Sequence, residues 1–418
     1  MPVNERSSSM VEEWDEVKHI ASDVRTTCSA CGNRLSSPLL DLPDLPLTEM
    51  YSAQQVHEKI GFVDQAFHFC TVCGHGLLAH VLDPQVVYGS QYTFRSSTSH
   101  TAIKALDMFN TFICRVVRDR TFDIVVEIGC SDLNLLKKLR GRASRLIGID
   151  PIFAHESYPD TDFTLIGDLV EHVNVHDITE GTDCLVVSSH TLEHLSDPRA
   201  LIEKLLHETS DNTIFCFQFP GLEYLVADWR FDQIFHQHLN YFSLRSLTHM
   251  LENLGGELIG YDVNPHHWGT LLVAFKKRSH TKNEPRFRAS SFQKLQEEEI
   301  LKNYSGFRLT MDSVSTRLTS FRDSKRVGYG ASLMLPILSY YLQNDLSCLD
   351  CIMDDDPQKD GQFYVNLPVP IQHSSHVASL EDTVCLLTSV ASRANVRPMM
   401  KKLFDRHVRE VIVPLSSV

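Results

Sequence analysis

The chain has 418 residues, of which 43% are hydrophobic and 22% are charged, proportions typical of a globular protein rather than a disordered or fibrous one. Such a length exceeds what one ordinary core buries, so two or three domains are expected. The 39 basic and 53 acidic residues give a net charge of −14, which repels phosphate backbones and argues against a nucleic-acid partner.

The sequence also argues against a membrane or secreted protein. No apolar run approaches the roughly 20 residues that span a bilayer, and the polar N-terminus lacks the apolar segment of a signal peptide. A cytoplasmic protein with no membrane partner is therefore predicted. In such a protein the 11 cysteines are expected to be thiols or metal ligands rather than disulfides.

Two Cys-x-x-Cys pairs, each followed by glycine, stand in the N-terminal third. The chain reads CSACG from Cys28 and CTVCG from Cys70. Two such pairs supply the four sulfurs of a closed, tetrahedral structural zinc site, and a glycine after the second cysteine suits the turn that the pair requires. The alternative is two unrelated turns with buried thiols. The pattern predicts one structural Zn²⁺ held by Cys28, Cys31, Cys70 and Cys73.

From residue 122 the chain alternates apolar runs with amphipathic stretches. The predicted strands read FDIVVEIG, RLIGID, TDCLVVSSH and NTIFCFQFP, and the predicted helices between them read SDLNLLKKLRG and PRALIEKLLHETS. This alternation indicates an α/β fold whose parallel sheet is covered on both faces. Two further runs, ELIGYDV and GTLLVAFKK, form a terminal hairpin that places an antiparallel strand in the sheet, as is usual at the end of a methyltransferase sheet.

The ends of the first two strands indicate the ligand. Gly129 closes the first and lets a ligand approach the backbone, and Asp150 closes the second, where a carboxylate can accept both hydroxyls of a ribose. A G-x-G-x-x-G loop for a dinucleotide pyrophosphate is missing, which favours S-adenosylmethionine over a dinucleotide. A generic Rossmann domain is the alternative. The predicted cofactor-binding residues are Glu127, Gly129, Asp132, Asp150, Pro151, Ser189 and His190.

The segment FDQIFHQHLNYFS, from Phe231 to Ser243, carries two histidines two residues apart. It follows a strand and precedes a helix whose N-cap is Ser243, a position where active-site residues gather in this architecture. A zinc ion between His236 and His238 would need a third ligand, which the neighbouring sequence does not supply. An acid/base role is therefore favoured.

The C-terminal third has its own pattern. Residues 286–326 have a helical rhythm and predict linking helices. The runs RVGYGA, CLDCIMDDDP, TVCLLTS and REVIVP then predict a small parallel sheet. The expected domains are a tail at 1–22, a zinc-binding module at 23–95, a methyltransferase core at 96–280 and an α/β domain at 281–418.

Taken in order, these features resemble the nucleotide-sugar C-methyltransferases. The resemblance covers almost the whole chain and rests on the two cysteine pairs, YTFRSSTS, VVEIG, HTLEHLSDP, FDQIFHQHLNYFS, VGYGAS and DDDPQKDGQFYVNLPVPI. It implies a class I S-adenosylmethionine-dependent methyltransferase core between a zinc module and a C-terminal Rossmann-like domain that helps to hold a nucleotide-sugar. The implied reaction is methylation at C-3 of a nucleotide-linked 4-keto-6-deoxy sugar by a monomer or small homo-oligomer.

Methylation of a carbon beside a ketone requires a base with a pKa near the working pH and stabilisation of the enolate. The resemblance places the base on His238, and His194 is expected at the same edge of the sheet. Tyr92, in the segment YTFRSSTS of the resemblance, is expected to hydrogen-bond the sugar or to contact the cofactor. The expected catalytic residues are thus Tyr92, His194, His236, Gln237 and His238.

The sequence departs from the family at three places. In the first loop, Cys130 and Ser131 replace a polar pair and Leu133 replaces a glycine; Gln237 stands where the family carries a carboxylate; and the loop after Gly330 lacks a later glycine. Two alternatives stay open: an O- or N-methyltransferase of another small molecule, which needs no α-proton base, and a non-catalytic scaffold that retains the fold, which Leu133 and Gln237 favour.

Overall fold

The computed structural model describes residues 22–84, 87, 100–154, 162–266, 269–279, 285–389 and 393–415. The N-terminal module is built from short strands around the cysteine pairs, and three of these strands join one sheet in the order β5-β4-β2. Its strands are β1 (Ser22–Val24), β2 (Leu40–Pro46), β3 (Tyr51–Ser52), β4 (Phe62–Phe69), β5 (Gly76–Leu78) and β6 (His80–Leu82).

The middle of the chain forms a seven-stranded sheet in the order β13-β14-β11-β10-β7-β8-β9. The β14 strand is antiparallel to both neighbours and the other pairs are parallel, so the predicted α/β fold with a terminal hairpin is confirmed. The strands are β7 (Phe122–Ile128), β8 (Ala143–Ile149), β9 (Phe163–Ile166), β10 (Cys184–Ser189), β11 (Ile214–Pro220), β13 (Gly256–Asn264) and β14 (Thr270–Lys277).

Helices cover both faces of this sheet, because side chains alternate along each strand. On β7, Val125 packs with the residues of α3 and α4, whereas Ile124 and Val126 pack on the opposite face with those of α6 and α8. The helices are α3 (His100–Val117), α4 (Asn134–Lys138), α5 (Val175–Thr179), α6 (Pro198–Glu208), α7 (Leu222–Ala227) and α8 (Leu244–Asn253). The helix predicted from residue 131 is reduced to the five residues of α4, since left-handed backbone at Ser131 and Leu133 delays its start.

The C-terminal domain has a second parallel sheet, of five strands in the order β18-β16-β15-β19-β20. The predicted set of strands lacked β18, which is only three residues long. The elements are α9 (Glu297–Ser320), β15 (Lys325–Tyr329), α10 (Leu335–Leu342), β16 (Cys351–Asp354), β17 (Phe363–Tyr364), β18 (Ile371–His373), β19 (Thr383–Leu387), α11 (Arg393–Phe404) and β20 (Glu410–Ile412).

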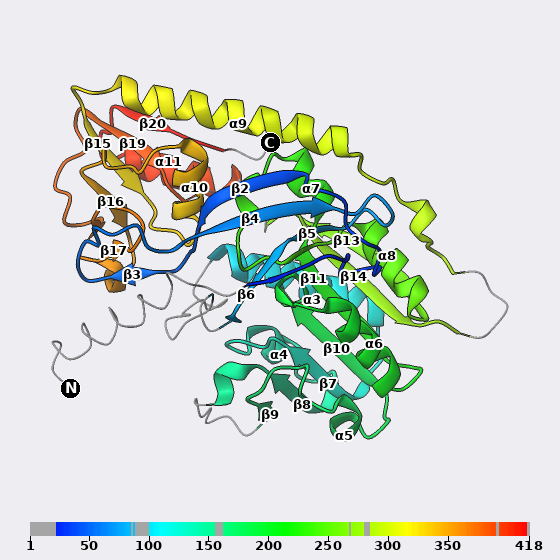
Figure 1. Ribbon diagram of the computed structural model, residues 1–418. Coiled ribbons are helices and arrows are strands. Elements are labelled where there is room, and N and C mark those ends of the chain that lie inside the picture. The colour runs from blue at the N-terminus through cyan, green and yellow to red at the C-terminus, as the bar shows by residue number, and fades with distance from the viewer. Residues whose placement is uncertain are drawn as a thin grey trace.

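One long helix, α9, replaces the separate linking helices expected before this domain. It runs unbroken through Gly306, where the indole of Trp229 packs against the helix. Figure 1 shows α9 lying along one side of the molecule, over both the C-terminal domain and α7 of the core. Although α9 has 24 residues, no helix in the described part of the chain is long and apolar enough to cross a membrane.

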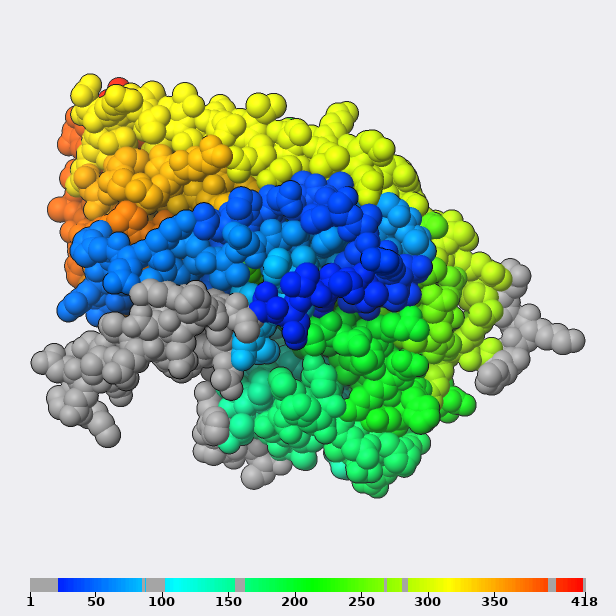
Figure 2. Space-filling view, in the orientation of Figure 1, coloured from blue at the N-terminus to red at the C-terminus, as the bar shows by residue number. Residues whose placement is uncertain are grey.

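The N-terminal module joins the two larger parts. Its β5 pairs with β12 (Asn240–Tyr241) of the core, and its β3 pairs with β17 of the C-terminal domain. In the space-filling view the module forms a blue band between the yellow and orange C-terminal region and the green core (Figure 2). One apolar cluster accordingly contains residues from all three parts, among them Leu42, Phe235 and Ile352.

Candidate active site and metal centre

The four cysteines of the two pairs lie together at the end of the N-terminal module. The Sγ atoms of Cys28 and Cys73 are 3.7 Å apart, those of Cys31 and Cys70 are 3.6 Å apart, and all four lie within 4.8 Å of one another. A tetrahedron with Zn–S bonds of about 2.3 Å has edges of about 3.8 Å. The four thiolates therefore fit one Zn²⁺ with no movement of the backbone.

The two halves of this cluster share one backbone geometry. The amide of Gly32 donates to the carbonyl of Cys28 at 2.8 Å, and that of Gly74 donates to the carbonyl of Cys70 at 2.8 Å. Both glycines have positive φ, +74° and +81°, a region that favours glycine over other residues. The duplicated CxxCG spacing thus produces two turns with the same hydrogen bond and a similar glycine conformation, one for each half of the cysteine cluster.

Most of the predicted cofactor residues lie at one edge of the sheet, at the cofactor corner where β7 and β8 end beside Gly129 and Asp150. Asp150 accepts hydrogen bonds from the amides of Ser131 (2.8 Å) and Ile152 (3.1 Å), and Gly129 donates to the carbonyl of Ile149 at 2.8 Å. Each carboxylate oxygen retains a further lone pair for a ribose hydroxyl. Asp132 and Pro151 flank this corner, and Ser189 and His190 end the adjacent strand β10.

Glu127 is a buried carboxyl beside the same corner. Its side chain is 3% exposed, and burial raises its pKa well above the usual range. Among the described residues, its Oε2 atom finds no hydrogen-bond donor. A buried acceptor left without a donor is costly, and a ligand with a hydroxyl or amino group, such as S-adenosylmethionine, would satisfy it. The residues at this corner therefore fit that cofactor.

The first loop contains a leucine in a left-handed conformation. Leu133, at the position where a glycine was expected, has φ +61° and ψ +19° and is fully buried among the α3 and α4 side chains. The conformation costs about 1–2 kcal/mol for a residue with a side chain, whereas burial of a leucine contributes about 1.5–3 kcal/mol. Packing offsets the strain, so this loop keeps its turn without the glycine.

Replacement of Gly129 by alanine is expected to abolish cofactor binding. A Cβ at this position would lie 2.1 Å from Oγ1 of Thr191, and φ is +72°. Either the loop or Thr191 must move, which displaces the backbone that faces the cofactor. Isothermal titration with S-adenosylhomocysteine measures the loss. Gly141→Ala is the matched control: its φ is +85° but its Cβ meets nothing within 4 Å, so it should retain cofactor affinity.

Three titratable side chains converge next to this corner. Glu193, His194 and His238 each offer a ligand atom, and these atoms lie within 4.8 Å of one another. The ring centroids of His194 and His238 are 5.1 Å apart, and the His238 ring also packs on Phe235 at 4.3 Å. Burial raises the pKa of Glu193 to about 7, although the neighbouring His194 opposes this shift. Glu193 was not among the predicted catalytic residues, and its only signal in the sequence is its position beside His194.

Hydrogen bonding fixes the tautomer of His194. Its Nδ1 lies 2.8 Å from the main-chain oxygen of Gln237, and because a carbonyl only accepts, Nδ1 carries the proton. The Nε2 atom of neutral His194 therefore has a lone pair. The structure thus brings His194 and His238 together as two groups suited to proton transfer.

His236 lies apart from this pair. It is 3% exposed, and its Nε2 donates to the main-chain oxygen of Leu45 at 3.0 Å while Nδ1 faces the Gln65 amide at 3.4 Å. These contacts tie the core to β2 and β4 of the N-terminal module. The geometry gives His236 a role in joining two parts of the chain. The Gln237 side chain faces Glu49 and the main-chain oxygen of Val87, and Tyr92 lies outside the described residues.

The burial of His236 predicts a pH dependence of stability. Burial lowers its pKa from 6.5 to about 4, so the unfolded chain binds a proton between these values when the native chain does not. Stability is then lost as pH falls from 6.5 to 4, by about 3 kcal/mol for this group. His236→Gln, which keeps a donor for Leu45, should lose correspondingly less over this window in urea unfolding. The exposed His172→Gln variant should follow the wild type.

The second sheet repeats the corner of the first. Asp354, at the end of β16, accepts from the amide of Ala331 at 2.6 Å and from that of Asp356 at 2.9 Å, and Gly330 donates to the carbonyl of Met353 at 2.8 Å. Three similar bonds are found at Asp150 in the methyltransferase sheet, where the first donating amide lies two residues after the glycine rather than one. The C-terminal domain therefore has the loop and acidic strand end at which nucleosides bind in such sheets.

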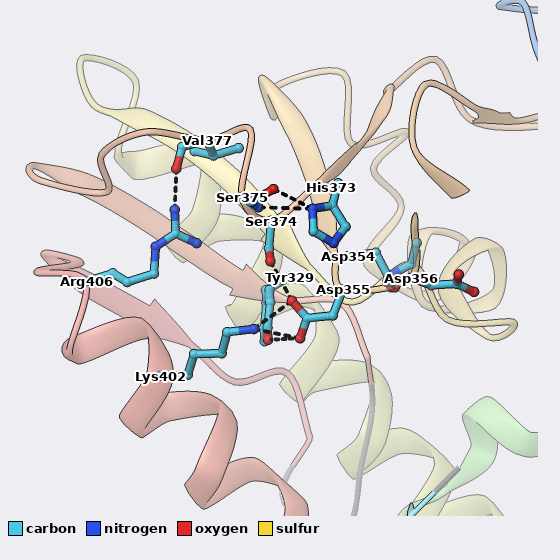
Figure 3. A network of polar contacts seen from close by, with 11 residues as sticks. Tyr329, Asp354, Asp355, Asp356, His373, Ser374, Ser375, Val377, Lys402 and Arg406 are labelled. Carbon is cyan, nitrogen blue, oxygen red and sulfur yellow. Dashed lines mark hydrogen bonds and ion pairs between the residues drawn. The ribbon is translucent and has the colours of Figure 1, made fainter. Parts of the chain in front are cut away.

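Beside Asp354, a polar network fixes the strand ends (Figure 3). Asp355 accepts from Tyr329 at 2.8 Å, from Ser374 at 2.5 Å and from Lys402 of α11 at 2.6 and 2.7 Å. Burial alone would raise the pKa of Asp355, but these donors, Lys402 foremost, lower it to about 2. The aspartate is thus ionised at neutral pH and holds α11 against the sheet.

Comparisons with known proteins agree with this architecture. Three family models match in sequence order: a zinc binding domain at residues 28–88, a methyltransferase domain at 108–260 and a C-methyltransferase C-terminal domain at 265–415. C-methyltransferase NovU of Streptomyces niveus is 25% identical over 207 residues, which are 49% of this chain and 49% of NovU. The chain thus aligns with about half the length of this curated relative.

Two solved methyltransferases match part of the chain at low sequence identity. Magnesium protoporphyrin IX methyltransferase of Synechocystis is 14% identical, with 47% of this chain and 92% of that chain covered and a TM-score of 0.34. N-methyltransferase NodS of Bradyrhizobium japonicum is 15% identical, with 42% and 97% covered and a TM-score of 0.32.

The strand order, the terminal hairpin and the glycine–aspartate corner define the middle of the chain as a class I S-adenosylmethionine-dependent methyltransferase core. The zinc binding domain before it and the C-methyltransferase C-terminal domain after it are more specific. The chain belongs to the C-methyltransferase family that combines these three parts.

Proposed function

We propose that this protein methylates C-3 of a nucleotide-linked 4-keto-6-deoxy sugar with S-adenosylmethionine as the methyl donor, in the biosynthesis of branched deoxysugars. The observation that carries the proposal is the pairing of His194 and His238 at the carboxyl edge of the cofactor-binding sheet. A reaction at carbon needs a base for a proton next to a ketone. Methyl transfer to an oxygen or nitrogen does not require a base that removes a proton from carbon.

In this proposal the residues of the chain divide the work. His238 removes the proton from C-3, and the protonated ring then stays beside the enolate as a compensating charge. His194, with its lone pair on Nε2, assists the proton transfer. Bound S-adenosylmethionine supplies the electrophilic methyl group, and the corner at Gly129 and Asp150 holds this cofactor.

The nucleotide of the substrate is assigned to the C-terminal domain. Support comes from the corner at Gly330 and Asp354, which repeats the hydrogen bonds of the cofactor corner. The N-terminal zinc module pairs through β5 with β12 of the core and through β3 with β17 of the C-terminal domain, so it bridges these two parts. The sugar then lies where all three parts meet.

The experiment that tests the proposal is turnover on a panel of nucleotide-linked 4-keto sugars, read as a methyl mass gain of the sugar. A second arm omits the cofactor and uses deuterated water, in which the enzyme should exchange the proton at C-3. Methyl transfer to oxygen or nitrogen with no exchange would instead favour the O- or N-methyltransferase. Cofactor binding with neither transfer nor exchange on any sugar would favour a non-catalytic scaffold.

A further inference from the structure

Glu49 lies where the three parts of the chain meet. It stands between β2 and β3 of the zinc module. Two residues later, Tyr51 pairs with Tyr364 of the C-terminal domain, with their ring centroids 4.9 Å apart. Towards the core, the Glu49 side chain contacts Gln237. Gln237 is the third residue of the FHQH segment, residues 235–238, and stands between its two histidines. The proposed reaction assigns no role to this carboxyl.

The backbone at Glu49 is strained. Its φ is +59°, a left-handed conformation that glycine adopts without cost and that residues with a side chain rarely adopt. Such outliers concentrate at functional sites, where the surrounding structure holds them in place. Asp44 shares this conformation on the surface, but Glu49 directs its carboxyl to Gln237 of the core, so the contact, and not φ alone, points to a function for the side chain.

Two acceptors, the Glu49 carboxyl and the main-chain oxygen of Val87, fix the orientation of the Gln237 amide. Nε2 of Gln237 donates to Oε2 of Glu49 at 3.5 Å and to the main-chain oxygen of Val87 at 3.1 Å. Because the Val87 carbonyl can only accept, the amide nitrogen must face the zinc module. Oε1 of Gln237 then accepts no hydrogen bond from any described residue and remains available to a ligand.

The same residue connects Glu49 to the catalytic histidines. The main-chain oxygen of Gln237 holds Nδ1 of His194 at 2.8 Å, and His238 is the next residue in the chain. Burial raises the pKa of the Glu49 carboxyl, while the Gln237 hydrogen bond and the charge of Lys359 oppose this shift. The Lys359 ammonium itself donates to the Ala331 carbonyl at 2.7 Å and lies 5.9 Å from the Tyr51 ring.

We propose that Glu49 is a positioning residue of the active site: its carboxyl holds the Gln237 amide so that Oε1 accepts a hydrogen bond from a hydroxyl or amino group of the sugar. The inference rests on the proposed function, since it assigns the substrate's polar group to that same site. It makes the zinc module a contributor to substrate specificity. A substrate that lacks a donor at this position should gain nothing from Glu49.

The test compares Glu49→Gln, Glu49→Asp and Asp44→Asn with the wild type. Asp44 is the matched control, since it is an acidic residue of the same module with φ +53° that pairs with Lys59 at 2.8 Å on the surface. We expect Glu49→Gln to raise KM for the keto sugar tenfold or more and to change the pH profile of kcat/KM, at unchanged melting temperature and zinc content. Glu49→Asp should recover part of the loss, and Asp44→Asn should match the wild type.

A substrate-free measurement separates this inference from the proposed function. The side-chain amide signal of Gln237 in a ¹⁵N–¹H spectrum, assigned by its loss in Gln237→Leu, should shift as Glu49 titrates and stay constant in Glu49→Gln. A wild type that methylates no keto sugar would overturn the proposed function, while the amide titration would still support the contact. Equal KM and pH profiles in Glu49→Gln and wild type, or an amide signal indifferent to Glu49, would overturn the inference.

Discussion

Replacement of His238 by alanine is expected to lower the rate of methyl transfer about 10²–10⁴-fold, the usual contribution of a general base. The ring packs against Phe235 and His194 next to the cofactor corner, so its loss removes the base and leaves the residues that bind the cofactor in place. We therefore expect kcat to fall and the affinity for S-adenosylhomocysteine to stay within about twofold of wild type, because no cofactor contact is removed. Single-turnover kinetics and calorimetry measure the two quantities.

The residual activity tests the role of His194. Its Nδ1 donates to the Gln237 carbonyl, so Nε2 carries the lone pair of the neutral ring, and we expect His194 to take over part of the proton transfer. The double variant His194→Asn, His238→Ala should then fall further than His238→Ala alone. The exposed variant His172→Asn should retain the full rate. A full rate of methylation in His238→Ala would refute the assignment of the base and favour an O- or N-methyltransferase.

Much of the architecture was predictable because it depends on local sequence. All strands of the seven-stranded core sheet except β9 followed from runs of apolar residues, and their alternation with helices predicted the parallel sheet that the structure confirms. The convergence of Gly129 and Asp150 at one corner followed from their positions at the ends of neighbouring strands. The two CxxCG turns were likewise visible in the sequence, and folding brings their four sulfurs together.

The parts of the site that escaped prediction depend on contacts between distant segments. His236 was expected among the catalytic residues, but its ring bonds Leu45, which is 191 positions away. Gln237 stands where the family carries a carboxylate, and its amide contacts the carboxyl of Glu49, which is 188 positions away. Periodicity and motif spacing carry no information on such pairings, because the docking of the zinc module on the core determines them.

Substitution of Cys70 by serine is expected to cost the chain its zinc and the fold of the N-terminal module. Structural zinc contributes about 10–16 kcal/mol in small zinc domains, which is comparable to or larger than the roughly 5–15 kcal/mol that stabilises a whole domain. Three thiolates with a weak oxygen ligand would not replace that energy. Metal analysis should find the zinc content well below one ion per chain, and thermal unfolding should show a lower melting temperature.

The control for this substitution is Cys348→Ser, a half-buried cysteine outside the cluster, which should retain zinc and stability. The damage from Cys70→Ser should extend to the active site, because β5 of the module pairs with β12, which begins two residues after His238, and because Leu45 bonds His236. Methyl transfer should therefore be lost together with zinc, although no cysteine of the cluster belongs to the histidine site. Retention of zinc and melting temperature in Cys70→Ser would contradict the four-cysteine site. Loss of zinc with full activity would show that the FHQH segment keeps its geometry without the module.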